Sequence, residues 1–302
     1  MNKKDNKKLK YLVTAVVLLL IYLIAGKVGL LLGFYNKSVS PFWPATGIAI
    51  AALLLLGYRF WPSILLGAFL FNFTTTPSIL VSFGVAAGNT LEGLAGAYLI
   101  SKYAKGKLAF TSINTTWAFF LVALIVPIIS ATIGVSSLIL GEFASVNNPL
   151  ALWLTWWIGD VIGAMLIVPL VLTIYNKAPI TIKKELYLEM ALAFVILISV
   201  SLILFMGWPI QISKSYHFAF LCIPILLWIA FRSCLRISIV ANFLVSIIAI
   251  IGTTLNLSIF NIESVNTALI VLQLFIGVTT ATTTSIAVIV VDYKKLLARL
   301  KK

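Results

Sequence analysis

Charged residues are scarce in this chain of 302 residues. Asp, Glu, Lys and Arg together make up 10 % of it, whereas about a quarter of the residues in soluble domains are charged. Hydrophobic residues make up 62 %, which is more apolar surface than a water-soluble protein can hide. The composition therefore excludes a soluble protein and indicates a polytopic membrane protein.

The chain also has few of the residues that build most catalytic and metal sites. Its two cysteines, Cys222 and Cys234, lie in or beside apolar runs and are not spaced as CxxC, so they support neither a disulfide nor a zinc site. Its single histidine, His217, is expected at the outer interface, far from any acid at membrane depth. No phosphate-binding glycine loop, triad spacing or HExxH is present. We therefore expect no enzyme activity, no cofactor and no metal.

Long apolar runs are abundant instead. They are continuous and do not alternate every second residue, which excludes a membrane β-barrel. Because backbone polar groups in lipid can pair only with one another, the spans should be helices of roughly 20 residues. We predict an all-α, polytopic transmembrane helical bundle. Its spans are expected near 11–34, 43–58, 61–75, 79–100, 114–140, 150–175, 186–206, 217–231, 235–256 and 265–291.

Two of these spans are short for a crossing at about 1.5 Å per residue. Residues 43–58 and 61–75 could each cross the bilayer, or together they could form a re-entrant hairpin. The prediction is therefore eight to ten membrane spans. Both alternatives leave the two termini on the same side.

Basic residues alternate between successive connections. Nineteen of the 22 Lys and Arg residues fall in the two tails and in every second loop, while Lys37 and Lys214 are the two in outer loops and Lys27 lies within the first span. This is the positive-inside pattern of a membrane protein and not a basic groove for nucleic acid. It predicts a multi-pass protein of the cytoplasmic membrane with both termini in the cytoplasm. We expect a basic tail at 1–10, a single integral-membrane domain at 11–291, and a short basic helix or tail at 292–302.

Two acids fall at membrane depth, Glu92 and Asp160. Glu92 continues a stripe of Gly84, Gly88 and Gly96 at four-residue spacing, and Gly159 and Gly163 make a second pair at this spacing beside Asp160. Small residues on one helix face let a neighbouring helix approach closely, so the acids should face helix contacts and not lipid. A central ionised Asp costs about 2.5–3.5 kcal/mol, which makes such acids functional candidates.

We expect these acids to line a cavity between spans, where carboxylates beside Trp faces suit an amine or another cation. The alternative is a structural role, as protonated carboxyls hydrogen-bonded between helices. The candidate ligand-binding residues are Glu92, Asp160, Asn89, Trp156, Trp157, Trp43, Thr46 and Asn72.

Five stretches, in this order, resemble the first membrane-associated sensor domain family (MASE, type one): FWPATGIAIAALLLLG, FWPSILLGAFLFN, GNTLEGLAGAYL, WWIGDVIGAMLIVPLVL and IPILLWIAFRSCLRISIVANFLVSIIAIIGT. The resemblance covers roughly residues 11–300. It implies a bacterial input module of eight spans that stands N-terminal to histidine kinase, PAS or diguanylate cyclase domains. The polar signature implied by the family falls on Trp43, Pro44, Gly47, Asn72, Asn89, Glu92, Trp157, Gly159 and Asp160.

The expected function is thus a sensory module that binds an unknown small ligand between helices and passes a conformational signal to a cytoplasmic partner. No output domain follows Lys302 in this sequence, so we expect either a fragment or a histidine kinase or diguanylate cyclase acting in trans. Membrane lipid is an expected partner, and nucleic acid is not. An ion- or proton-coupled transporter, or its substrate-binding membrane subunit, is the alternative, and a membrane enzyme is a third reading.

Overall fold

The computed structural model describes residues 3–33, 40–144, 148–177, 184–210, 215–261 and 265–300, and all regular structure there is helical. Lys37 and Lys214, expected in outer loops, lie outside these residues. The helices are α1 (Lys3–Leu31), α2 (Pro44–Leu56), η1 (Tyr58–Phe60), α3 (Trp61–Thr75), α4 (Ile79–Tyr103), η2 (Gly106–Leu108), α5 (Ile113–Ile125), α6 (Pro127–Leu140), α7 (Pro149–Tyr175), η3 (Lys184–Leu186), α8 (Tyr187–Ser201), η4 (Leu202–Met206), η5 (Tyr216–Leu221), α9 (Cys222–Arg232), α10 (Leu235–Thr254) and α11 (Val265–Leu300).

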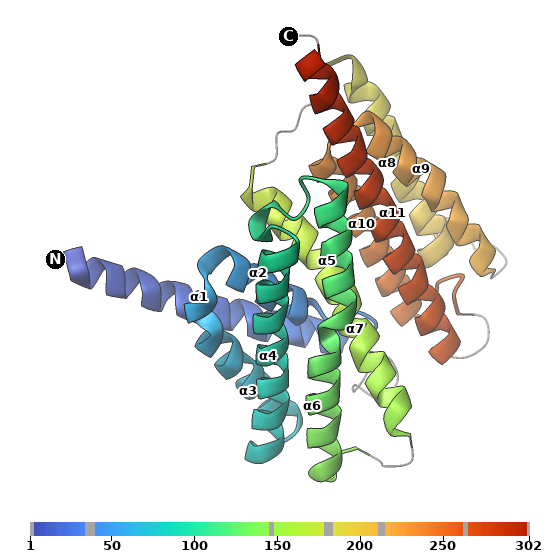
Figure 1. Ribbon diagram of the computed structural model, residues 1–302. Helices are drawn as coiled ribbons and strands as arrows, with labels where there is room; N and C mark the ends of the chain where they lie inside the picture. Colours follow the sequence, from blue (N-terminus) through green and yellow to red (C-terminus); the bar gives the residue numbers. More distant parts are fainter. Residues whose placement is uncertain are drawn as a thin grey trace. The chain divides into compact units, whose positions relative to one another are not determined.

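The prediction of an all-α membrane bundle is confirmed (Figure 1). Seven segments of the described chain are long and apolar enough to cross a membrane, so this is a multi-pass membrane protein. They are Asp5–Leu31, Ile79–Tyr103, Ile113–Leu140, Pro149–Tyr175, Tyr187–Met206, Leu235–Thr254 and Thr267–Leu297. Pro44–Leu56 and Tyr216–Arg232 are shorter apolar helices.

The two short predicted spans form a helical hairpin, α2 and α3. Each helix has a proline in its first turn, Pro44 and Pro62, where the missing N–H costs no hydrogen bond. Gly57 ends α2 with a φ of 97°, a conformation that a side chain would strain, and η1 completes the turn. Helix breakers at both ends thus explain why neither helix reaches 20 residues.

The hairpin lies along α1, and the contacts fix which way it points. At its turn, the Tyr11 hydroxyl donates to the Arg59 carbonyl at 3.0 Å, and the Arg59 guanidinium lies 5.5 Å from the centre of the Tyr11 ring. Further along, the Phe71 ring packs on Gly26. The turn therefore reaches the end of α1 that follows the basic N-terminal tail. Where α1 crosses the bilayer, a hairpin that follows it in this way crosses twice.

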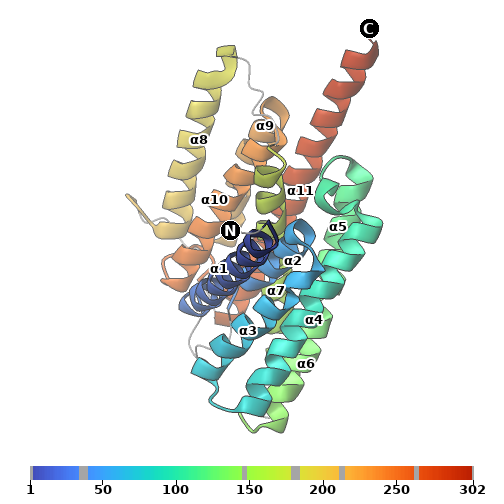
Figure 2. The same cartoon turned by 90° about the vertical axis from the view of Figure 1, so that its left-hand side faces the viewer.

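The described chain clusters into two compact units. The first contains Met1–Lys102 and Val122–Ala164, and the second contains Tyr103–Leu121 and Met165–Lys302. In the first unit, α4 and α6 lie side by side in both views (Figures 1 and 2), with Gly84 facing Ser137 and Gly88 facing Ile133. The single domain expected at 11–291 stays a prediction.

The second unit is built around α8 to α11. α8 ends in a turn of π-helix, Leu202–Met206, whose Phe205 carbonyl lies against Gly252 of α10. α10 in turn packs on α11, where the Asn242 amide donates to the Thr280 hydroxyl at 2.8 Å. All eight candidate ligand-binding residues belong to the first unit.

Candidate functional site

Asp160 lies on α7 between two glycines that admit the chain leading into α2. The Trp43 N–H donates to the Gly159 carbonyl at 3.0 Å. A side chain at Gly159 would collide with the Ser40 carbonyl, and one at Gly163 would collide with the Trp43 carbonyl. The glycine pair beside the acid therefore makes room for backbone, and this close approach brings the first turn of α2 to Asp160.

Glu92 lies on the stripe of small residues along α4. Gly88, one turn before it, packs against Ile133 of α6, and Gly96, one turn after it, packs against Ile50 of α2. The stripe thus faces helix contacts, as its spacing predicts. The Glu92 side chain is directed into the interior of the unit, where it is 1 % exposed, and Asp160 is fully buried.

Thr46 of α2 joins the two acids. Its hydroxyl donates to Oδ1 of Asp160 at 2.7 Å and lies 3.2 Å from Oε2 of Glu92. Thr46 is the third residue of α2, and the positive end of a helix dipole favours negative charge there. Glu92 and Asp160, which are 68 positions apart in the chain, therefore meet at the start of a third helix.

The hydrogen bonding of the carboxyl pair is incomplete. Among the described residues, Oε1 of Glu92 and Oδ2 of Asp160 are buried and have no hydrogen-bond partner. The Thr46 hydroxyl has one hydrogen and cannot donate to both acids at once. No Lys or Arg is among the described groups that interact with either carboxyl. A proton or a cation is what this arrangement still requires.

A second polar chain borders the acids. The Trp156 indole donates to the Ser130 hydroxyl at 3.1 Å, and Ser130 donates to Oδ1 of Asn89 at 2.7 Å. Ser130 also interacts with both carboxyl groups. The Trp156 ring packs on Gly134, which has no side chain to keep it away. The polar chain ties α4, α6 and α7 together beside the carboxyl pair.

The structure brings together five of the eight candidate residues: Glu92, Asp160, Asn89, Trp156 and Thr46. The side chains of the other three make their contacts elsewhere in the unit. The Trp157 indole donates to the Leu124 carbonyl at 2.8 Å, and the Asn72 amide donates to the Ala68 carbonyl of its own helix at 2.8 Å. The Trp43 ring lies edge-on to Phe71, with ring centres 5.5 Å apart. A ligand-binding role for all eight stays a prediction.

Two residues of the cluster were not among the candidates. Ser130 is fully buried, and Tyr22 of α1 is 1 % exposed and interacts with Asn89. Each stands four residues before a glycine, Gly134 and Gly26, so each shares the small-residue spacing that singled out Glu92. Hydroxyl side chains are common in apolar spans, so the four-residue spacing to a glycine is too weak a signal to identify Ser130 and Tyr22 as site residues from the sequence.

Together these features define the class: a multi-pass helical membrane protein with a buried, incompletely paired carboxyl pair inside one helical unit. The model of the MASE1 family matches residues 14–293, so the chain belongs to this family, whose members are membrane-associated sensory input domains. None of the curated proteins and none of the solved structures matches the chain.

Proposed function

We propose that this protein is a sensory input module of the cytoplasmic membrane that binds a small monovalent cation at Glu92 and Asp160. The observation that carries the proposal is the pair of buried carboxylate oxygens without partners. Leaving a buried charged acceptor unpaired costs more than leaving a neutral one unpaired. A metal ion such as Na⁺ or a protonated amine would supply the missing positive charge.

A purely structural carboxyl pair is expected to have most of its oxygens hydrogen-bonded. Buried polar groups in folded proteins are paired in the great majority of cases. Here a single hydroxyl, that of Thr46, lies within hydrogen-bonding distance of one oxygen of each acid, and the other oxygen of each acid has no partner among the described residues.

The position of the pair supplies a route from binding to signalling. Thr46, Glu92 and Asp160 belong to α2, α4 and α7, so a cation held between the acids would favour packings that keep these helices together. A ligand shifts a conformational equilibrium by its differential affinity for the two states. We infer that the shift passes to a cytoplasmic partner, such as a histidine kinase or diguanylate cyclase in trans.

The test is ligand-dependent stabilisation of the purified full-length chain in nanodiscs. The thermal unfolding midpoint is measured with sodium, potassium, ammonium or methylammonium chloride at constant ionic strength. At least one cation should raise the midpoint, since saturation at a hundredfold excess over Kd is equivalent to about 2.7 kcal/mol. Glu92→Gln/Asp160→Asn should abolish the rise. No rise with any cation, or an equal rise in the double variant, would refute cation binding.

Transport by the same acids is a distinct outcome. The full-length chain is reconstituted in liposomes, and uptake of the stabilising cation is followed with and without an imposed proton gradient. A sensor binds without accumulating its ligand. Uptake that disappears in Glu92→Gln/Asp160→Asn would replace the sensory proposal with an ion-coupled carrier.

A further inference from the structure

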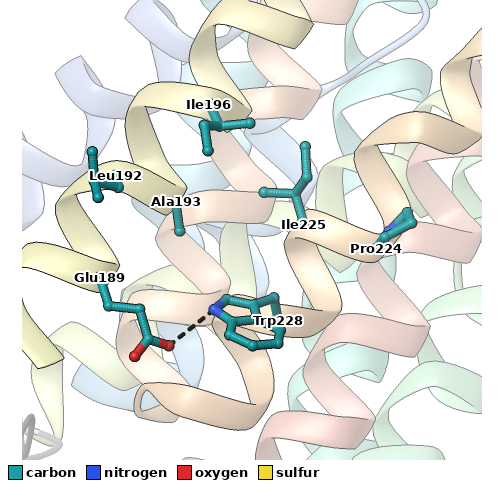
Figure 3. Close-up of a pocket in the computed structure, with 7 residues that line it drawn as sticks. All are labelled: Glu189, Leu192, Ala193, Ile196, Pro224, Ile225 and Trp228. Carbon is teal, nitrogen blue, oxygen red and sulfur yellow. Dashed lines mark hydrogen bonds between the residues drawn. The ribbon is translucent and has the colours of Figure 1, made fainter.

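An apolar groove lies between α8 and α9 in the second unit. Its cavity volume is about 380 Å³, within the range of small-molecule sites. Figure 3 shows side chains of the two helices facing each other across it, with Glu189 and Trp228 joined at one end. The groove is lined by Glu189, Leu192, Ala193, Ile196, Pro224, Ile225 and Trp228.

The polar end of the groove carries a fixed ion pair. The Arg232 Nε donates to Oε1 of Glu189 at 2.7 Å, and one terminal nitrogen donates to Oε2 at 2.7 Å. The Trp228 indole donates to the same Oε1 at 3.0 Å. The groove thus runs from a charged end to Ile196, about 10 Å further along α8, and its walls are apolar over that length.

The ion pair leaves some of the N–H donors of the Arg232 guanidinium without a partner among the described residues. An arginine has five N–H donors, and Glu189 takes two of them. The Arg232 side chain is 45 % exposed, whereas that of Glu189 is 27 % exposed. Three donors therefore remain on a group whose orientation the carboxylate fixes, and a planar donor fork of this kind matches a phosphate.

The walls of the groove suit a flexible chain better than another helix. Leu192 is 53 % exposed, Ile196 52 % and Trp228 55 %. Close helix packing in membranes uses small residues, and these side chains are large. An apolar channel that ends at an oriented arginine and an interfacial Trp matches an amphiphile with an acyl chain and a phosphate.

We propose that the groove between α8 and α9 binds a phospholipid with a phosphoethanolamine headgroup. The acyl chain lies along Leu192, Ala193 and Ile225, and the phosphate accepts hydrogen bonds from the free donors of Arg232. Glu189 determines which lipid headgroup can bind. Its carboxylate disfavours a headgroup with a net negative charge at this end of the groove. Oε1 accepts two hydrogen bonds and Oε2 accepts one, so one lone pair on Oε2 can accept a hydrogen bond from a headgroup ammonium.

The test is native mass spectrometry of the purified full-length chain with equimolar dioleoyl phosphatidylethanolamine and dioleoyl phosphatidylglycerol. We expect one retained phosphatidylethanolamine per chain. Arg232→Gln removes the phosphate contact and should weaken retention about tenfold, the effect of one charge-assisted hydrogen bond. Arg59→Gln, which removes another exposed arginine outside the groove, should leave retention unchanged.

A second pair of variants tests the groove without touching its charges. Ala193→Phe places a ring in the channel and should abolish retention. Val195→Phe adds the same ring two residues along α8, where the side chain is 60 % exposed and outside the groove. It should retain the lipid. Equal thermal unfolding midpoints for the two variants would show that the loss is local.

Three results would overturn the proposal. Phosphatidylglycerol retained as strongly as phosphatidylethanolamine would exclude the headgroup. Retention that survives Ala193→Phe would place the lipid elsewhere. A dimer that Ala193→Phe converts to a monomer would show that a second copy of the chain occupies the groove.

Discussion

At the residue scale, one hydroxyl connects the two acids of the site. Thr46 is 4 % exposed, and its hydroxyl lies 2.7 Å from Oδ1 of Asp160 and 3.2 Å from Oε2 of Glu92. A buried carboxyl that loses a donor keeps that part of its desolvation cost, whereas a lost surface bond is replaced by water. The stability of the first unit should therefore be sensitive to this hydroxyl.

Thr46→Val keeps the shape of the side chain and removes the hydroxyl. We expect a loss of about 1–3 kcal/mol in the free energy of unfolding, measured by thermal or denaturant unfolding in detergent micelles. Thr46→Ser keeps the donor and should stay within about 1 kcal/mol of the parent chain. In the Glu92→Gln/Asp160→Asn background, the difference between Val and Ser should shrink, because neutral amides are cheaper to leave unpaired. An equal difference in both backgrounds would show that Thr46 acts by packing alone.

The sequence could predict which faces of α4 and α7 are buried, but not what they meet. Four-residue spacing of glycines around Glu92 and Asp160 is a local signal, and both residues are buried in the structure. Thr46 lies 114 residues from Asp160, and no local pattern links the two positions. Trp157 was a candidate that the structure does not bring to the carboxyl pair, although it adjoins Trp156 in the sequence. Its indole donates to a backbone carbonyl of α5, because neighbouring residues of a helix point in different directions.

At the element scale, the predicted spans and the helices correspond closely, and the differences have local causes. The expected span 114–140 consists of α5 and α6, since Pro127 cannot continue the backbone hydrogen bonding of α5. α1 begins at Lys3 and α11 continues to Leu300, so the described residues of both basic ends are helical. The pattern of apolar residues cannot locate the ends of these helices, because a helix can continue into a solvated, lysine-rich turn that has no apolar residues.

The orientation of the α2–α3 hairpin gives a topology prediction. Because the turn lies beside Tyr11, a cysteine at Arg59→Cys should be labelled from the same side as the N-terminal tail. In a Cys222→Ser/Cys234→Ser background, a membrane-impermeant maleimide should label it in inside-out vesicles and not in right-side-out vesicles. Thr76→Cys, just after α3, should show the reverse pattern. Both positions labelled from the outside would restore the re-entrant hairpin and eight spans.

At the scale of the whole molecule, the division between the two units falls within continuous helices. α7 carries Asp160 in the first unit and runs past an internal proline, Pro169, to Tyr175 in the second. The second unit contains α11, whose 36 residues extend about 54 Å, well beyond a hydrocarbon core of about 30 Å. Covalent helices therefore link the carboxyl pair to the unit that carries the longest helix.

This continuity predicts that the state of the acid pair is felt at the end of α11. A spin label on Tyr293→Cys, at a position that is 59 % exposed, should report a different mobility in Glu92→Gln/Asp160→Asn than in the parent, both lacking Cys222 and Cys234. Glu142→Gln, which neutralises an exposed acid, should leave the spectrum unchanged. Neutralising the pair removes the charge that a cation would bridge, so the helices that hold it settle in another packing, and α7 carries the change into the second unit. Identical spectra in the parent and the double variant would mean that the pair stabilises the first unit without signalling through the second.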